Sequence, residues 1–158
     1  MSQRLNYAQQ SPDLAKKLFE LSQASKGSLG HTLIDLINIR ASLMNGCAFC
    51  LDMHVKEAKI HGERELRVHH IAIWRESTLF SARERAALEW TEAVTKLSDH
   101  GIPDETFTRV REHLSEKELS DITFAVGIIN MWNRLSVSFA SVPGSLDTMY
   151  GLTKAGLN

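Results

Sequence analysis

Two helical patterns meet within residues 41–54, which read ASLMNGCAFCLDMH. Asn45-Gly46 interrupts the apolar periodicity on either side of it, as glycine commonly does between periodic segments. We therefore expect a new helix to begin at or next to Cys47, and the two cysteines of the chain, Cys47 and Cys50, both fall in its first turn. This junction combines a helix boundary with a pair of thiols.

The composition is that of one globular domain. The chain has 158 residues, 43% of them hydrophobic and 23% charged, and its 18 Lys and Arg nearly balance 19 Asp and Glu for a net charge of −1. A chain of this length can bury a sizeable core. The near-zero charge excludes the basic surface expected of a nucleic-acid binder. We expect residues 1–158 to form a single domain without a nucleic-acid partner.

No targeting or membrane segment is evident. The first ten residues, MSQRLNYAQQ, lack the apolar core of a secretory signal. The longest apolar stretch, from Ile122 to Trp132, is interrupted by Asn130 and is too short to cross a bilayer. We therefore expect a cytoplasmic protein with no membrane partner. Thiols are kept reduced there, so a close cysteine pair is more often redox-active or metal-binding than structural.

The apolar periodicity is helical throughout, and it predicts an all-α fold of about seven helices. The first predicted helix begins at Pro12, and Leu14, Leu18 and Leu21 form a stripe on it that we expect to face the core. The others are predicted over residues 31–44, 48–60, 63–74, 81–97, from 103 onward, and 115–140.

Two of these helices carry a specific start signal. Ser81 is followed three residues later by Glu84, and Ser115 by Glu118. In this capping-box pattern each side chain binds a free backbone N–H of the other residue. Both segments should therefore begin as helices at these serines.

Cys47, Cys50 and His54 share one face of their predicted helix. At 3.6 residues per turn, Cys50 lies roughly 60° around the axis from Cys47, and His54 lies roughly 20° from it. The positive end of the helix dipole stabilises a thiolate at this terminus and lowers its pKa. Two thiols that can close a disulfide, with a base one turn away, suit peroxide reduction or dithiol exchange.

An acid on the preceding helix is a candidate partner for the histidine. If the chain reverses at Asn45-Gly46, Asp35 and His54 are roughly level along the two helices, some 12–15 Å from the turn at about 1.5 Å per residue. Asp35 would then orient His54, directly or through water. Glu57, three residues after His54, could orient the ring instead, although we expect it on a solvated face.

Two other interpretations of the cysteines remain. The pair could be small buried hydrophobic residues, although the preceding glycine and the histidine on the same face argue against this. It could also bind zinc together with His54 and one of His31, His61 or Asp35, but no second pair of ligands completes a structural site. We favour redox chemistry and expect neither a metal nor a cofactor.

These residues resemble the alkyl hydroperoxidase AhpD-like proteins of the carboxymuconolactone decarboxylase superfamily. The resemblance rests first on residues 41–54 and continues in IWRE (73–76), FSARERAAL (80–88) and NMWNRL (130–135). It extends over most of the chain, to about Phe139. The resemblance implies an all-helical fold, assembled as trimers or hexamers, with a thiol peroxidase site.

The same resemblance implies a role for each residue of the site. Cys50 would attack the peroxide, Cys47 would resolve the sulfenic acid as a disulfide, and His54 would accept the proton with help from an acid on the preceding helix. That acid is commonly Glu in the family, and Asp35 stands here with a reach about 1.5 Å shorter, one C–C bond. Phe49 occupies a place where some relatives carry a histidine.

The predicted function is a thiol-dependent peroxidase with peroxiredoxin-type activity. Its partners would be a hydroperoxide substrate and an external dithiol reductant of the lipoyl or thioredoxin type. A carboxymuconolactone decarboxylase-type enzyme is one alternative, but those relatives generally lack the CxxC motif. A non-catalytic redox-sensing oligomer is the other.

Overall fold

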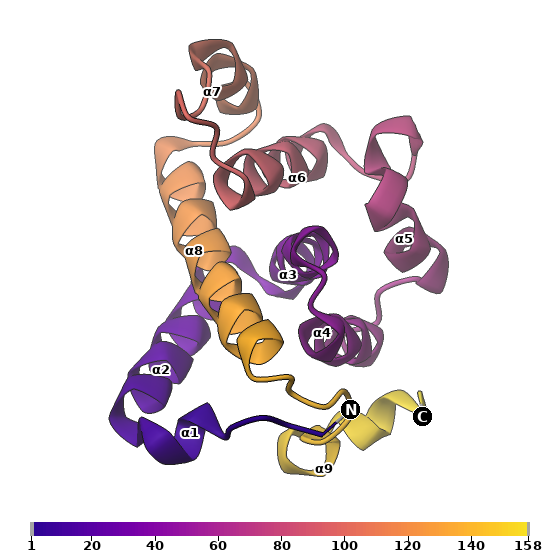
Figure 1. Ribbon diagram of the computed structural model, residues 1–158. Coiled ribbons are helices and arrows are strands. Elements are labelled where there is room, and N and C mark those ends of the chain that lie inside the picture. The colour runs from indigo at the N-terminus through magenta and orange to yellow at the C-terminus, as the bar shows by residue number, and fades with distance from the viewer. Residues whose placement is uncertain (1, 158) are drawn as a thin grey trace.

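A computed structural model describes residues 2–157, and in that range every regular element is a helix (Figure 1). The α-helices are α1 (Tyr7–Gln10), α2 (Pro12–Leu29), α3 (His31–Asn45), α4 (Ala48–Ile60), α5 (Glu65–His70), α6 (Ala82–Thr95), α7 (Asp104–Arg111), α8 (Glu116–Ser138) and α9 (Asp147–Tyr150), and the 3-10 helices are η1 (Ile71–Glu76) and η2 (Leu152–Ala155). The predicted all-α class is therefore confirmed.

The seven predicted helices correspond to α2 through α8, with one change. The segment predicted over residues 63–74 is divided into α5 and η1, and Ile73 has a non-helical φ of −122° inside η1. The short elements α1, α9 and η2 were not predicted, because four residues are too few to generate a helical period.

Helix α3 is the centre of the molecule, and α4, α6 and α8 pack around it (Figure 1). The apolar side chains of α3 are buried in the core of the molecule on different sides of the helix: Leu33, Leu36, Ile37 and Ile39. A helix whose apolar side chains point to several sides must be covered by neighbouring elements on those sides. Helix α3 therefore fixes the position of α4, which carries the cysteine pair.

The long helix α8 belongs to the core, and its N-terminus is closed by a capping box. Ser115 and Glu118 form the predicted capping box, as do Ser81 and Glu84 at α6. Ile122 and Val126 are fully buried within α8. Over residues 2–157, no helix combines the length and the apolarity that crossing a membrane would require.

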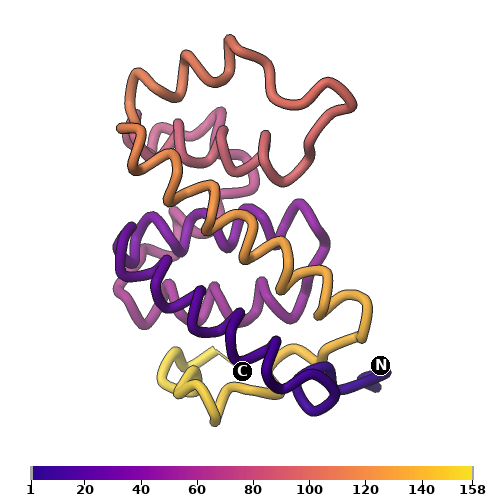
Figure 2. Tube along the Cα trace, turned by 90° about the vertical axis from the view of Figure 1, so that its left-hand side faces the viewer, coloured from indigo at the N-terminus to yellow at the C-terminus, as the bar shows by residue number. Residues whose placement is uncertain are grey.

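The predicted core-facing stripe of α2 is only partly correct. Leu18 is buried, whereas Leu14 is 66% exposed and Leu21 is 46% exposed. Helix α2 lies at the edge of the bundle and packs mainly along α8, so a narrow strip of its surface is covered (Figures 1 and 2). Leu21 instead borders an apolar groove between α2 and α8, together with Phe124 and Met131.

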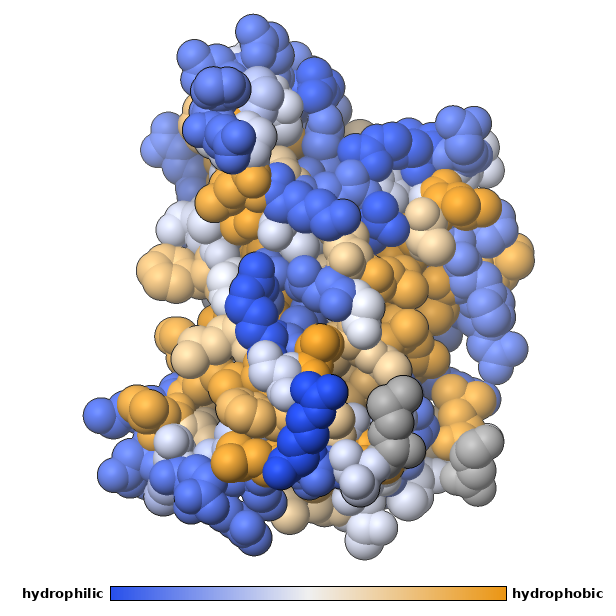
Figure 3. All heavy atoms as spheres, viewed as in Figure 1, coloured by the Kyte–Doolittle hydropathy of each residue, from blue (hydrophilic) through white to orange (hydrophobic). Residues whose placement is uncertain are grey.

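Hydrophobic side chains reach the surface over the lower parts of α2 and α8 (Figure 3). Phe124 and Met131, in the groove, are both exposed. An apolar groove of this kind is a common feature of surfaces that bind another protein chain.

The chain after α8 folds back against α4. The buried Lys56 ammonium donates to Asp52 at 2.8 Å and to Asp147 at 2.7 Å, and the backbone N–H of Gly144 donates to Asp52 at 3.1 Å. These bonds hold the C-terminal segment at the same end of the molecule as the N-terminus (Figures 1 and 2).

Because α3 lies at the centre, truncating one of its buried side chains should destabilise the fold more than truncating an exposed side chain elsewhere. Ile37→Ala should lower the free energy of unfolding by about 3 kcal/mol, because the fully buried side chain leaves a cavity. Ile73→Ala, at a side chain that is 59% exposed, is the matched control and should change it by less than about 0.5 kcal/mol. Urea unfolding followed by circular dichroism measures both, and equal losses would contradict this description of the core.

Candidate active site

The turn between α3 and α4 places Cys47 at the start of a helix, as predicted. Gly46 ends α3 in the left-handed conformation with φ 64°. The N–H of Cys47 donates to the carbonyl of Ser42 at 3.0 Å and that of Gly46 to Leu43 at 3.3 Å, the paired bonds of a Schellman motif. Cys47 is the N-cap of α4, and its Sγ accepts the backbone N–H of Cys50 at 3.3 Å.

Both cysteines are free thiols, with Cys47 2% exposed and Cys50 3% exposed. The pKa of Cys47 is lowered to about 7, chiefly because the Cys50 thiol donates a hydrogen bond to it and also because the Cys50 backbone N–H does so; burial opposes this change. The pKa of Cys50 is raised, because its proton is held by the Cys47 sulfur and because the thiol is buried. Near neutral pH the pair therefore tends to hold one proton, with negative charge on Cys47.

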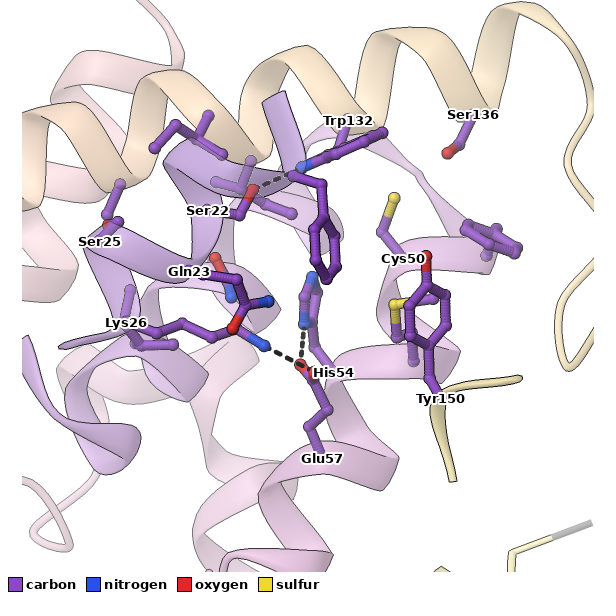
Figure 4. A pocket seen from close by; sticks show the side chains of 18 of the residues that line it. Ser22, Gln23, Ser25, Lys26, Cys50, His54, Glu57, Trp132, Ser136 and Tyr150 are labelled. Atoms are coloured by element: carbon purple, nitrogen blue, oxygen red, sulfur yellow. Dashed lines mark hydrogen bonds and ion pairs between the residues drawn. The ribbon is translucent and has the colours of Figure 1, made fainter. Parts of the chain in front are cut away.

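A pocket of about 300 Å³ opens beside this pair (Figure 4). Cys50 and His54 line it, whereas Cys47 does not. A molecule in the pocket would therefore meet the Cys50 sulfur first. Most of the other lining residues are apolar or aromatic, and they come from α1, α2, α3, α4, α8 and the C-terminal segment: Tyr7, Phe19, Ser22, Gln23, Ser25, Lys26, Ile34, Asn38, Phe49, Met53, Glu57, Ala125, Ile128, Ile129, Trp132, Ser136, Leu146 and Tyr150.

His54 is held by a carboxylate on its own helix. Its Nδ1 lies 2.7 Å from Oε2 of Glu57, and Oε1 of Glu57 accepts from Nζ of Lys26 at 2.7 Å (Figure 4). Burial alone would raise the pKa of Glu57, but His54 and Lys26 lower it to about 2. An ionised carboxylate only accepts hydrogen bonds, so Nδ1 carries the hydrogen and Nε2 is left as the basic nitrogen.

Asp35 was expected to orient His54 directly or through water, and it makes no direct hydrogen bond with that ring. The helical hairpin forms, but the buried Asp35 carboxylate binds Nδ1 of His61, the C-cap of α4, at 2.7 Å. His61 lies about two turns beyond His54. The register between α3 and α4 thus pairs Asp35 with the far end of α4, while Glu57 already occupies Nδ1 of His54. Burial raises the pKa of Asp35, although the bond to His61 opposes this.

Glu57 differs in role from the sequence-based expectation. Glu57 was expected on a solvated face, yet it is the partner of His54; its spacing of three residues was the only local signal. His61, named above only as a possible zinc ligand, is the C-cap of α4, where the ring of His31 packs at 4.1 Å between centroids. Lys26 comes from α2, and no local pattern links it to α4.

Three asparagines connect the cysteine turn to α8. Asn45 donates to Asn130 at 2.7 Å and to Asn133 at 2.9 Å, and Asn133 donates to the hydroxyl of Ser42 at 3.1 Å. Asn133 is fully buried. The NMWNRL motif therefore fixes the last turn of α3, and with it the position of Cys47.

The zinc alternative gains no support from the geometry. Zinc sites in proteins require three or four converging side chains. Among residues 2–157, no group of three or more His, Cys, Asp or Glu side chains has an arrangement that could hold a metal ion.

Comparison with known proteins identifies the family. Residues 12–93, from the first residue of α2 into α6, match the model of the carboxymuconolactone decarboxylase family. The chain belongs to this family. The matched span includes Cys47, Cys50, His54 and Glu57.

Within the carboxymuconolactone decarboxylase family, the chain is similar to several proteins. It is 39% identical to the uncharacterized protein YdfG of Bacillus subtilis over 142 aligned residues, and the aligned region covers 89% of this chain and 97% of YdfG. A crystal structure from Agrobacterium tumefaciens, of a protein of unknown function that its description relates to the antioxidant defence protein AhpD, is 44% identical, with a TM-score of 0.86 over 90% of this chain and 98% of that one. The AhpD-like fold is therefore established.

The same fold carries more than one chemistry. The debrominase Bmp8 has a TM-score of 0.75 to this chain at 21% identity, and the superposition covers 92% of this chain and 78% of Bmp8. At that identity the similarity is one of fold alone. The reaction of this carboxymuconolactone decarboxylase family member depends on its own side chains.

The shared proton predicts how the thiols titrate. One thiolate per chain should form with a midpoint near pH 7, because the pKa of Cys47 is about 7. The ultraviolet absorbance of the thiolate measures this transition. Cys47→Ala should abolish this transition. Cys50→Ala should move it to higher pH, because Cys47 loses the thiol that donates to it. A transition that persists unchanged in Cys47→Ala would contradict the assignment of the negative charge.

Proposed function

We propose that this chain is a thiol-dependent peroxidase in which Cys50 attacks a hydroperoxide, Cys47 resolves the product and His54 accepts the proton. The observation that carries this proposal is the pair of buried free thiols in the first turn of α4, with Cys50 lining a mostly apolar pocket that His54 also lines. The histidine beside it is oriented so that one ring nitrogen is basic.

The first step consumes the peroxide. The proton of Cys50 passes to Nε2 of His54, and the thiolate sulfur forms a bond to one peroxide oxygen as the O–O bond breaks. The bonding electron pair leaves with the other oxygen, which takes the proton back from His54 and departs as an alcohol. Sulfur is oxidised by two electrons to the sulfenic acid, and the peroxide is reduced by two.

The second step uses the charge that Cys47 holds. Its thiolate attacks the Cys50 sulfur and forms a disulfide across the first turn of α4, while the S–O bond breaks and the sulfenic hydroxyl takes up one proton from solvent and leaves as water. Cys47 needs no further base for this step, because its pKa of about 7 already favours the thiolate. The whole cycle converts two thiols and a hydroperoxide into a disulfide, an alcohol and water.

An external dithiol must then reduce the disulfide, and burial restricts which one. Each cysteine residue is at most 3% exposed, and the pocket that reaches Cys50 has a volume of about 300 Å³. Thiol exchange requires direct contact between the attacking sulfur and the disulfide. We therefore propose a small or arm-borne dithiol of the lipoyl type as reductant, in preference to the convex surface of a folded thioredoxin-type protein.

The cellular setting proposed for this chemistry is a cytoplasmic homo-oligomer. The apolar groove between α2 and α8 supports such an assembly, because exposed Phe124 and Met131 would be covered by a second copy. A trimer or hexamer is the proposed state. A redox-sensing oligomer would share these features but would show no turnover with any reductant.

Turnover separates the peroxidase from the sensor. With cumene hydroperoxide and dihydrolipoamide, wild type should turn over, and it should be slower with reduced thioredoxin. Cys50→Ser should lose on the order of 1,000-fold in rate, because the nucleophile is gone. Coupled assays of alcohol formation measure this, and Ser98→Ala, far from the pocket, is the control. Wild-type activity in Cys50→Ser would refute the assignment.

The partner of His54 can be tested with two isosteric variants. Glu57→Gln should lower kcat roughly 10- to 100-fold, because a general base that loses its oriented tautomer loses much of its contribution. Asp35→Asn, which alters the bond to His61 instead, should change kcat less than about 3-fold. If Asp35→Asn were the more damaging of the two, Asp35 and not Glu57 would serve His54.

A further inference from the structure

The hydroxyl of Ser136, on α8, is buried without a partner. Ser136 is 3% exposed, and its Oγ makes no hydrogen bond with any residue in the range 2–157. A buried hydroxyl that lacks a partner costs free energy, and such groups in native proteins call for a specific explanation. Ser136 also lines the pocket that contains Cys50 and His54.

The direction of this hydroxyl relates it to the reacting sulfur. The Ser136 oxygen and the Cys50 sulfur point toward one another from α8 and α4, and in that view His54 lies on the other side of the sulfur (Figure 4). Although it forms no hydrogen bond of normal geometry with residues 2–157, the hydroxyl lies near both thiols and the Tyr7 hydroxyl and acts to lower the pKa of all three groups, against the burial that raises it. A serine hydroxyl can rotate about its C–O bond, so it can aim its hydrogen at a group that arrives at the sulfur.

Ser25 on α2 also lines the pocket with an Oγ that has no hydrogen-bond partner in the described part of the chain, but in Figure 4 it lies beyond Gln23 and Lys26, on the opposite side of the view from Cys50. Two other serines near the site are already engaged. Ser22 donates to the carbonyl of Leu18 at 2.8 Å and accepts from Nε1 of Trp132 at 2.9 Å. Ser42 accepts from Asn133 at 3.1 Å, behind the pocket wall. Beside the Cys50 sulfur, Ser136 is therefore the serine whose hydrogen is available to a ligand.

We propose that Ser136 is a catalytic residue whose hydroxyl donates a hydrogen bond to the hydroperoxide bound at Cys50. This inference rests on the proposed peroxidase function and adds a residue to it. When the O–O bond breaks, negative charge develops on the departing oxygen, and preorganised donors in a site shielded from water stabilise such charge strongly. With His54 on one side of the sulfur and Ser136 on the other, both peroxide oxygens have a donor. Ser136 keeps its proton, so the balance of the step is unchanged.

A comparison of two reactions of the same sulfur tests this role. Single-turnover oxidation by cumene hydroperoxide requires a peroxide oxygen, whereas alkylation by iodoacetamide does not. Ser136→Ala should slow oxidation roughly 10- to 100-fold, the loss expected for a hydrogen bond to a charged group, and should change alkylation less than about 3-fold. Ser138→Ala, at an exposed serine on the same helix, is the matched control and should alter neither rate.

Stability gives an independent readout. Because the Ser136 hydroxyl has no hydrogen-bond partner among residues 2–157, Ser136→Ala should be at least as stable as wild type in thermal unfolding. A structural role for the hydroxyl would instead lower the midpoint.

Each contrary outcome has a distinct meaning. If Ser136→Ala were oxidised as fast as wild type, or if alkylation slowed by the same factor as oxidation, the role of Ser136 would be overturned while the peroxidase function stood. If wild type itself reacted with the hydroperoxide no faster than Cys50→Ser, both proposals would fall together.

Discussion

The coupling between the two buried cysteines, whose backbone link is the 3.3 Å hydrogen bond from the Cys50 N–H to the Cys47 sulfur, is the interaction on which the chemistry of this site depends. It makes Cys47 an acid with a pKa of about 7 and keeps the proton on Cys50. The thiol that faces the pocket is therefore the protonated one, and it must give up its proton before it can attack. His54, which lines the same pocket and is oriented by Glu57, is placed to accept that proton.

The rest of the fold holds that pair in place. The Schellman turn at Gly46 brings Cys47 to the N-terminus of α4, and the asparagines of α8 secure the turn from behind. The buried Lys56 ties the C-terminal segment to α4, so that Leu146 and Tyr150 close one side of the pocket. The thiols are thus shielded from bulk solvent, and small molecules reach Cys50 through a mostly apolar space.

Features encoded within a few residues could be predicted from the sequence, and features set by packing between helices could not. The capping boxes at Ser81 and Ser115 and the helix start at Cys47 depend on local hydrogen bonds, and they were predicted correctly. The partner of Asp35 depends on the register between α3 and α4, and a level position along the hairpin was too coarse to identify His61. The exposure of Leu14 also depends on packing between helices, because α8 covers only a narrow strip of α2.

Mass spectrometry of the intact chain after one equivalent of hydroperoxide tests the central claim most directly, since that claim is that the two thiols act as one redox unit. The account predicts that wild type loses the mass of two hydrogen atoms, with both thiols unreactive to alkylation and a disulfide between Cys47 and Cys50, and that Cys47→Ser instead gains one oxygen atom on Cys50. A wild-type chain that retained two free thiols, or that kept a stable oxygen adduct without forming the disulfide, would contradict it.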